Sequence, residues 1–345
     1  MLTQAQIIQL ISSPASRAEL IAKALPTEQM VAVDPLLSNI ASQWIVDDTM
    51  YAAQRIFPLV QTSIVSGLIA QYERRDFFRV HDVRPRDDGV ESQGGGFRTT
   101  LTHRYLCKEW AHHMDIGDNL RAQQQAPINL DRDAMAYVVQ LMKLKRDYLF
   151  AQAAWLPGVW GTDVTGIAGA TNYLINQVRQ WSDYATPSNP QADVDYYRRV
   201  MALSTGGFKP NRLAVTKDVW DALKNHPLII AGYVFTGAVP NLTTRQVADV
   251  LELDDIIVCE SVGNYGPEAG QWVGRWIFGT GRALLYYVPS SPSITQPAAG
   301  YTFGWTGANH LGTTVAIERY RLANDAKADR IVGNMHFDVN VVETV

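Results

Sequence analysis

The sequence predicts an α+β protein organised around one long helix. Residues 129–155 place an apolar side chain at every third or fourth position, which is the spacing of one helical face. A strand-like pattern over residues 57–72 leads into a highly charged segment, residues 71–110, with a glycine-rich tip, and residues 191–260 alternate helical and extended patterns. These three features together predict mixed helix and sheet rather than a helical bundle or an all-β fold.

The composition limits the class of protein. The chain has 345 residues, of which 47% are hydrophobic and 19% charged, so it can bury a sizeable core. Its net charge of -4 argues against a protein whose main task is to grip nucleic-acid phosphates. The two cysteines, Cys107 and Cys259, are too few for a disulfide framework or a zinc set, and we expect both to be buried. The N-terminus does not read as a signal peptide, and no apolar run is long enough to predict a membrane span.

The first 56 residues predict an arm rather than a domain core. Residues 1–25 have a weakly amphipathic helical pattern, and a second helix is expected over residues 35–54. An extended connection around Pro26 separates them. Such an arm needs another surface to lie on.

The charged segment predicts a long two-stranded hairpin. Residues 71–110 contain eight basic and seven acidic side chains, interleaved with aromatic residues, and residues 87–96 include three consecutive glycines that predict a flexible tip. Fixing about 40 residues costs roughly 40 kcal/mol of backbone entropy, equivalent to burying about 1,600 Å² of apolar surface. The hairpin therefore either folds back on its own domain or is ordered across a neighbouring subunit, and its composition leaves both open.

The long helix has clear ends. Asn129 can cap its start, Asp131 and Asp133 lie where the helix dipole favours negative charge, and Pro157 and Gly158 end it. A helix of this length spans about 40 Å. Its predicted apolar stripe comprises Leu130, Ala134, Tyr137, Leu141, Leu144, Tyr148, Ala151 and Trp155.

The second half of the chain predicts a compact α/β unit followed by sheet. Helices are expected at 191–204, 217–225 and 243–251, strands at 212–216 and 255–260, and a short helical stretch before the long helix at 107–126. Residues 271–320 carry few charges and have sheet-like composition. Near the C-terminus Met335, Phe337, Val339 and Val341 alternate with Asn334, His336, Asp338 and Asn340. This predicts a half-buried strand whose apolar face packs on the stripe of the long helix.

Candidate chemistry is sparse. A Glu-x-x-His spacing occurs within Glu109, His112, His113, Asp115 and Asp118 on the predicted helical stretch. Di-iron bundles use this spacing twice, and it occurs here once, so we interpret these residues as surface or interface polar groups. The Gly279-Thr280-Gly281 sequence is followed by a strand-like run rather than a helix, so it predicts a hairpin turn and not a nucleotide site. The sequence therefore indicates no catalytic residue, no cofactor and no metal.

The nine tryptophans are interpreted as core or interface anchors, since aromatic side chains contribute much of the energy of both. Five of them lie in the segments discussed above or beside them: Trp155, Trp160, Trp272, Trp276 and Trp305.

The order of these parts resembles the major capsid proteins of tailed double-stranded-DNA phages, the fold named after phage Hong Kong ninety-seven. Four local strings add to the likeness: residues 283–307 (ALLYYVPSSPSITQPAAGYTFGWTG), DRIVGNMHFDVNVV near the end, WSDY at 181–184 and HPLI at 226–229. The likeness covers nearly the whole chain, and none of these strings is catalytic. It implies a tailed-phage major capsid fold.

The resemblance implies five parts: an N-terminal arm (1–56), an extended loop or long β-hairpin (57–110), a peripheral domain (111–187) with a spine helix at 129–156, an axial domain (188–312), and return strands of the peripheral domain (313–345). It also implies a structural, non-enzymatic protein that self-assembles into hexamers and pentamers of an icosahedral shell. This shell would enclose double-stranded DNA without sequence-specific binding.

The implied partners are other copies of the chain, with portal, scaffold or decoration proteins as further candidates and no membrane. The implied location is the virion capsid, assembled in the host cytoplasm. Contacts between subunits are expected at Arg74, Arg75, Arg79, Arg84, Arg86, Asp87, Asp88 and Glu91.

Two alternatives remain open from the sequence. An encapsulin-type nanocompartment shares the fold and would bind a cargo peptide instead of DNA. A soluble α/β metalloenzyme would use the residues between Glu109 and Asp118. No long charged scaffolding region precedes the arm, so a separate scaffold protein or none is expected. Although Lys108 lies at the base of the hairpin, no motif singles out a lysine and asparagine pair for a covalent cross-link.

Overall fold

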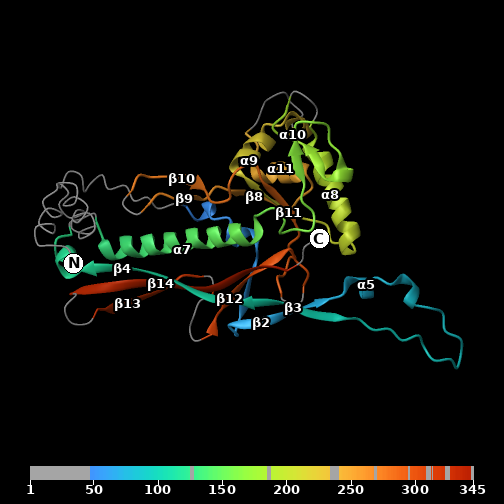
Figure 1. Cartoon of the computed structure of the whole chain (residues 1–345), viewed down its shortest axis with the longest axis horizontal. Helices are drawn as coiled ribbons and strands as arrows, with labels where there is room; N and C mark the ends of the chain where they lie inside the picture. The colour runs from blue at the N-terminus through green and yellow to red at the C-terminus, as the bar shows by residue number, and fades with distance from the viewer. Residues whose placement is uncertain are drawn as a thin grey trace, which may run out of the picture.

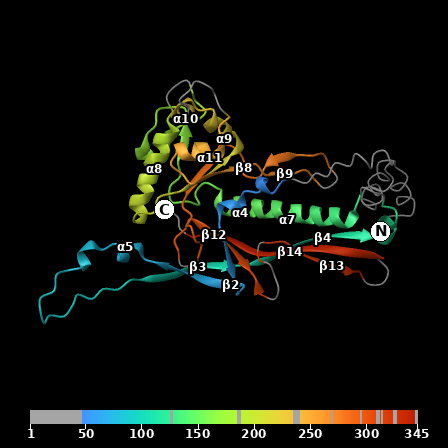
Figure 2. The same ribbon diagram turned by 180° about the vertical axis from the view of Figure 1, so that it is seen from behind.

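The computed structural model describes residues 47–124, 128–184, 188–233, 241–267, 270–293, 296–307, 312, 314–322 and 327–342. Figure 1 shows a long helix lying along an elongated sheet, a helix-rich unit above one end of that helix, and a hairpin that extends away from the body. Figure 2 shows the same arrangement from behind. The helices predicted at 1–25 and over most of 35–54 lie outside the described residues.

The long helix is confirmed as α7, Leu130–Ala154. The side chain of Asn129 caps it by accepting a hydrogen bond from the Arg132 backbone N–H at 3.1 Å. The buried face differs from the predicted stripe, because Val138, Met142 and Phe150 are buried while Tyr137 is 49% exposed. Tyrosine keeps its hydroxyl at the surface, so the purely apolar neighbours turn inward.

The final strand is confirmed as β14, Ala328–Val341, the central strand of a five-stranded sheet. One side of β14 pairs antiparallel with β4, Lys108–Gly117, and the other with β12, Gly300–Trp305, and β13, Ala316–Arg321. Strand β1, Leu59–Thr62, lies parallel to β12.

Gly333 on β14 permits the close approach of helix and sheet. A Cβ at this position would lie 2.5 Å from Val138 Cγ1 and 3.1 Å from Val315 Cγ1. Beyond it, Met335 and Phe337 cluster with Val138 and Met142, as the alternating pattern predicts.

The opposite face of β14 is more buried than predicted. Asn334 is 8% exposed and His336 is 6% exposed. The His336 backbone N–H donates to the Gly312 carbonyl at 2.9 Å, and the Trp305 ring lies 5.3 Å from the imidazole. The polar residues predicted that this face of β14 would be open to solvent, but neighbouring segments cover part of it.

The helical stretch predicted at 107–126 is wrong. Residues 108–117 form β4, and only Asp118–Ala122 are helical, as α6. Trp110, Met114 and Ile116 point toward α7 at alternating positions, which is a period of two and not of 3.6. The charged residues between them lie on the opposite face of a strand.

The two-stranded hairpin is confirmed at its base. Strand β2, Ser66–Tyr72, pairs antiparallel with β3, Thr99–Leu106, with a bulge between Ile69 and Gln71. The ladder of strand pairs ends at Tyr72 and Thr99. Within residues 73–98, only the short helix α5, Arg74–Phe77, and the 3-10 turn η2, Val80–Asp82, are regular. We call residues 73–98 the projecting loop (Figure 1).

The unit above the helix is the predicted α/β arrangement. Strand β7, Arg212–Thr216, lies between β8, Asp255–Cys259, parallel to it, and β11, Ala283–Tyr286, antiparallel to it. Four helices accompany this sheet: α8, Pro190–Thr205; α9, Lys217–Lys224; α10, Pro227–Tyr233; and α11, Thr244–Val250.

Short elements join these layers: η1, Asp48–Met50; α4, Ala53–Ile56; β5, Thr165–Ile167; η3, Tyr173–Ile175; β6, Gln177–Arg179; β9, Val262–Asn264; and β10, Gly274–Trp276. Residues 279–281 connect β10, which pairs with β9, to β11, which pairs with β7. The hairpin turn predicted there is therefore wrong, although Gly279 and Gly281 do adopt positive φ angles of 70° and 67°.

Candidate assembly surface

Most of the projecting loop makes no contact with the rest of the described chain, and its packing is confined to its first residues, where the Phe78 ring lies against Gly206 at the end of α8. Residues 79–98 are all exposed, including Val80 at 83% and Val83 at 87%. Figures 1 and 2 both show the loop directed away from the body. Of the two possibilities left by its composition, folding back on its own domain does not occur in these residues.

The predicted contact residues divide into two groups. Arg79 is paired within the loop, since its Nη2 donates to Asp76 Oδ1 at 2.6 Å and its Nη1 lies 3.7 Å from Asp82. Arg75 lies 3.3 Å from Glu73. The others are exposed and have no ion pair with any residue that the structure describes: Arg74, Arg84, Arg86, Asp87, Asp88 and Glu91. The tip therefore presents unpaired charges of both signs at the surface of the described chain.

An aromatic cluster stands where the ladder ends. The rings of Tyr72, Phe77 and Phe97 lie 5.4 to 5.9 Å apart. All three side chains are at least half exposed. The cluster packs the two arms of the hairpin together beside the hydrogen bond that the Glu73 backbone N–H donates to the Arg98 carbonyl at 3.0 Å. The aromatic residues were visible in the sequence, but their mutual contact depends on the irregular path of residues 73–98.

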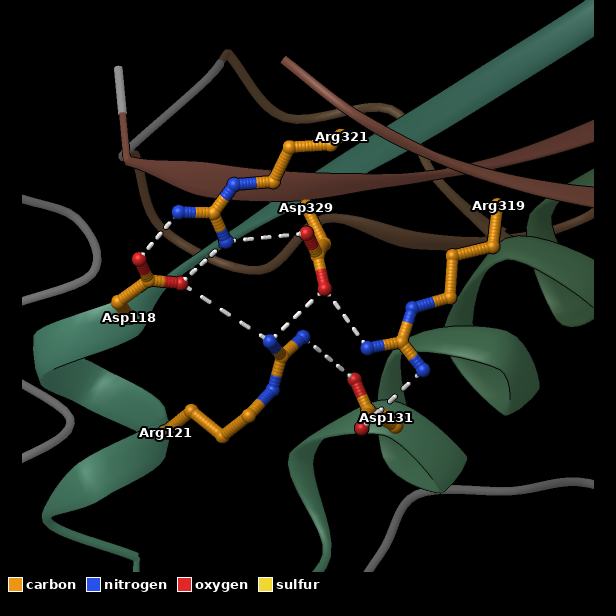
Figure 3. Close-up of polar contacts among 6 residues, drawn as sticks. All are labelled: Asp118, Arg121, Asp131, Arg319, Arg321 and Asp329. Carbon is orange, nitrogen blue, oxygen red and sulfur yellow. Dashed lines mark hydrogen bonds and ion pairs between the residues drawn. The ribbon is translucent and has the colours of Figure 1, made fainter. Parts of the chain in front are cut away.

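A network of three arginines and three aspartates lies at the end of the sheet layer that is next to the start of α7 (Figure 3). Arg121 on α6 bonds to Asp329 at 2.8 Å and to Asp131 at 2.9 Å. Arg319 donates to Asp329 at 2.7 Å, and Arg321 bonds to both Asp329 and Asp118. The network connects the start of α7, α6, β13 and β14.

The arginines stabilise the charged carboxylates of this network. Hydrogen bonds from Arg319, Arg121 and Arg321 hold the pKa of Asp329 well below its usual range. The pKa of Asp118 is lowered by its hydrogen bond from Arg321. The sequence showed these residues only as scattered charges, since the network needs residues about 200 positions apart.

The candidate metal residues do not converge. Asp115 pairs with Arg330 through two bonds of 2.7 and 2.8 Å, and Asp118 belongs to the arginine network. His112 faces α7, whereas Glu109 and His113 lie on the other face of β4. Among the described residues no group of three or more histidine, cysteine or acidic side chains could hold a metal ion.

A serine and a histidine meet in the helix-rich unit without forming a nucleophile and base pair. Ser188 Oγ lies 2.7 Å from His226 Nε2, and His226 Nδ1 accepts a bond from the Leu228 backbone N–H at 3.2 Å. Because Nδ1 accepts, Nε2 carries the proton and donates to the serine. The serine in turn donates to the Asp183 carbonyl at 3.3 Å. The imidazole therefore cannot take the serine proton in this arrangement.

The residues around the Ser188 and His226 contact give a structural role to two of the strings noted in the sequence, WSDY and HPLI. Trp181 Nε1 donates to buried Asp193 at 3.0 Å, and the Tyr184 hydroxyl donates to the Ala222 carbonyl at 2.7 Å. The Tyr184 ring lies 5.6 Å from His226. The WSDY and HPLI segments thus pack on each other, and their role here is structural.

A buried carboxylate joins three separate segments beneath the helix-rich unit. Asp147 on α7 is fully buried and accepts hydrogen bonds from the backbone N–H groups of Ala52 and Ala53 at 3.2 and 3.1 Å and from the Ser261 hydroxyl. Burial raises its pKa, and these hydrogen bonds oppose that rise. It fixes the point where the N-terminal segment meets α7 and the end of β8.

The two cysteines are free and buried, as expected. Burial raises the pKa of Cys107 to about 11, so its thiol stays protonated near neutral pH. Among the helices described, none combines the length and apolar character needed to cross a membrane.

Known protein families and solved structures include phage-related proteins that are similar to this chain. The model of the family described as phage major capsid protein E matches residues 166–298. A phage-related protein from Bordetella bronchiseptica is similar in structure, with a TM-score of 0.61 at 21% identity over 90% of this chain and 93% of that one. Comparison with curated proteins gives no match.

Two further structures are similar at lower identity. An encapsulin from Synechococcus elongatus matches with a TM-score of 0.51 at 10% identity over 91% of this chain and 93% of that one. The capsid of cyanophage P-SCSP1u matches with a TM-score of 0.48 at 11% identity over 84% of each chain. The family match and the two likenesses above 0.5 give this chain a phage major capsid protein fold.

Proposed function

We propose that this chain is a major capsid protein, a structural subunit of an icosahedral phage head without catalytic activity. Its capsid fold, combined with a projecting loop whose residues 79–98 are all exposed, is the observation on which the proposal rests. Subunits would form hexamers and pentamers, and the shell would enclose packaged double-stranded DNA. The site of action is the virion, after assembly in the host cytoplasm.

The energetics of the loop favour a partner. Ordering its 26 residues costs roughly 26 kcal/mol of backbone entropy at about 1 kcal/mol per residue, equivalent to burying about 1,000 Å² of apolar surface. An intersubunit interface of ordinary size buries about 1,600 Å² in total, of which roughly 900 Å² is apolar, an area similar to the one that ordering the loop requires. A neighbouring subunit can therefore supply what the loop lacks in the isolated chain, while unpaired charges of both signs at the tip fix the register.

The net charge of the chain is consistent with a shell that does not bind its DNA electrostatically. A net charge of -4 leaves no excess of cations to bind DNA phosphates tightly. DNA would be enclosed rather than bound in a sequence-specific way. Portal, scaffold and decoration proteins are further partners that such a shell would use.

Negative-stain electron microscopy of the purified full chain tests the proposal. Closed shells, tubes or hexamer sheets are the expected result. A small discrete oligomer over a range of protein concentration and ionic strength would overturn it. Mass photometry of the same sample separates capsomers from larger assemblies.

The second candidate is an encapsulin-type nanocompartment, favoured by the likeness to the Synechococcus encapsulin over 91% of the chain. It predicts the same shells with a peptide-tagged protein cargo inside. Shells isolated from the native source distinguish the two, since nuclease-protected DNA indicates a phage head and a co-purified cargo protein indicates a nanocompartment. Neighbouring portal and terminase genes would also favour the phage head.

A further inference from the structure

The projecting loop leaves the body through a short segment whose contacts differ from those of its tip. We call this segment, residues 72–79 with 97 and 98, the loop base. Residues 80–96 beyond it are all exposed, and their single regular element is η2. The direction in which these residues extend is therefore decided by the contacts of the loop base.

Asp76 joins the two arms of the hairpin beyond the last strand pair. Its Oδ2 accepts a hydrogen bond from the Arg98 backbone N–H at 3.0 Å, and its Oδ1 accepts one from Arg79 Nη2 at 2.6 Å. The side chain of Asp76 is only 1% exposed. The Glu73 backbone N–H also donates to the Arg98 carbonyl at 3.0 Å. A buried carboxylate that is bonded from both arms holds them at a fixed separation.

Three aromatic rings add apolar contacts to the loop base. The Phe77 ring centroid lies 5.9 Å from that of Tyr72 and 5.4 Å from that of Phe97, and Tyr72 and Phe97 are 5.5 Å apart. These rings come from the end of β2, from α5 and from the arm that returns to β3. The two arms are therefore held by apolar and polar contacts together.

The Phe78 ring connects the loop base to the helix-rich unit. Gly206 follows the last residue of α8 with a φ of 81°, and a Cβ there would lie 2.5 Å from Cε2 and Cζ of Phe78. The ring therefore lies directly on the backbone of a residue that has no side chain to displace it. Figures 1 and 2 both show α5 on the same side of the molecule as α8. Phe78 remains 53% exposed, so this contact is small enough to open without unfolding the body.

The loop base is thereby attached to two layers of the molecule. Strands β2 and β3 connect it to the sheet layer. The Leu106 backbone N–H donates to Asp338 at 2.8 Å, and Gln71 Nε2 donates to the Val342 carbonyl. The Phe78 ring provides the second attachment, to α8. A segment held at two points cannot turn about either one, whereas loss of the Phe78 contact would leave the two strands as a single pivot.

We propose that the contact between Phe78 and Gly206 sets the direction of the projecting loop, and that its release lets residues 80–96 turn about the ends of β2 and β3. Asp76 is a positioning residue in this device, because it fixes the turn of chain that carries Phe78. This inference rests on the proposed function and specifies how the chain prepares the loop for a neighbouring copy. A neighbour that binds the loop in one direction binds the held loop more tightly, since part of the ordering cost is already met within the chain.

Distances between two spin labels test the direction of the loop. The labels are placed at Val83→Cys in the loop and Ile317→Cys on β13, where both native side chains are exposed, and the native Cys107 and Cys259 are buried. The full-length protomer is measured by double electron–electron resonance below the concentration at which it assembles, after dilution with unlabelled chain. We expect one narrow distance distribution.

Phe78→Ala should broaden this distribution about twofold, because a loop without its anchoring contact samples many directions within microseconds and freezing traps all of them. Phe78→Tyr keeps the ring and should leave the width unchanged. Val80→Ala is the matched control, since Val80 also lies in the loop and is 83% exposed. A distribution as narrow for Phe78→Ala as for the control would overturn the inference.

Variants of Asp76 test its positioning role. Asp76→Ala removes the acceptor shared by both arms and should broaden the distribution as Phe78→Ala does. Asp76→Asn keeps one acceptor oxygen and should give an intermediate width. Circular dichroism should show the same folded protomer for all three variants. An unchanged width for Asp76→Ala would overturn its role in directing the loop.

The outcomes for the loop and for the shell are separable. Phe78→Ala should raise the protein concentration at which half of the chain forms shells by about tenfold, because ordering one or two further residues on association costs a factor of this size. A broadened distribution with unchanged assembly would overturn the inference and leave the capsid function standing. The same broadening in a chain that forms no shells at any concentration would support the set direction of the loop and contradict the capsid function.

Discussion

Charged side chains are paired with one another in the sheet layer beneath α7 and are mostly unpaired in the projecting loop. In the layer, charges separated by more than 200 positions pair with each other, as Asp118 does with Arg321, and α7 packs on the apolar face of β14. In the loop, residues 79–98 are all exposed and most of the charges are unpaired in the described chain. The layer is stabilised within one chain, whereas the loop has the composition of a surface that is completed by another chain.

Charge reversal in the loop should have the largest effect on assembly and almost none on folding. Substitution of Arg74, Arg75, Arg79, Arg84 and Arg86 by glutamate should abolish shells in negative stain. Exposed substitutions change the free energy of unfolding by about 0.5 kcal/mol or less each, so the protomer should remain folded by circular dichroism. The same five arginines changed to lysine keep the charge and serve as the control. Intact shells from the glutamate variant would contradict the role of the loop.

Removal of the buried carboxylate should be the most damaging single change within the body. Asp147→Ala leaves two backbone N–H groups and the Ser261 hydroxyl without their acceptor. We expect a loss of about 3 kcal/mol in the free energy of unfolding, measured by denaturant titration. Asp88→Ala in the projecting loop is the matched control and should change stability little. Equal stability of the two variants would show that Asp147 does not join these segments.

The close contact of helix and sheet predicts a smaller loss. Gly333→Ala places a Cβ 2.5 Å from Val138 Cγ1, so α7 or β14 must shift. We expect about 1–3 kcal/mol of destabilisation in the same titration. Gly117→Ala is the control, since it meets no atom within 4 Å and its φ of -70° suits any residue. A neutral Gly333→Ala would indicate that the layer is looser than the structure shows.

The arginine network predicts the smallest effect, and one that depends on pH. The pKa of Asp329 is lowered in the folded chain, so its contribution is present above the unfolded value of about 3.9 and is lost as the pH falls toward the folded value. Asp329→Asn should lower the melting temperature slightly at pH 7, and the difference from the unaltered chain should shrink below pH 4. Because the network is partly open to solvent, added salt should also reduce the difference. A difference that grows with acidity would contradict this assignment.

Local patterns were sufficient for the elements whose signal lies within one segment. Asn129 as cap, α7 and the helices and strands between 190 and 259 were all predicted within one or two residues of their ends, apart from α10. The alternation of β14 was predicted near its C-terminal end, but the strand already begins at Ala328. The charged residues named in the projecting loop are exposed in the structure, and their contacts with other subunits remain a prediction. The division of the chain into arm, peripheral and axial domains likewise remains a prediction.

The errors arise where the partner of a segment lies far along the chain. Residues 108–117 carry a helix-like Glu-x-x-His spacing, yet they form a strand because β14 offers ten consecutive partners from Ala328 to Phe337. The network around Asp329 could not be predicted for the same reason, since Arg121 lies 208 positions away along the sequence. The tryptophans could be named as anchors from the sequence, but whether each was core or surface could not.

The sequence by itself determined the secondary structure of segments with strong periodicity and the concentration of charge in the projecting loop, because both depend on neighbours within a few residues. Only the tertiary structure decided which face of α7 is buried, that β4 is a strand, and that Trp155 lies in the core while Trp272 is exposed. Burial and strand pairing depend on which distant segments meet in space, and a local pattern contains no information about them.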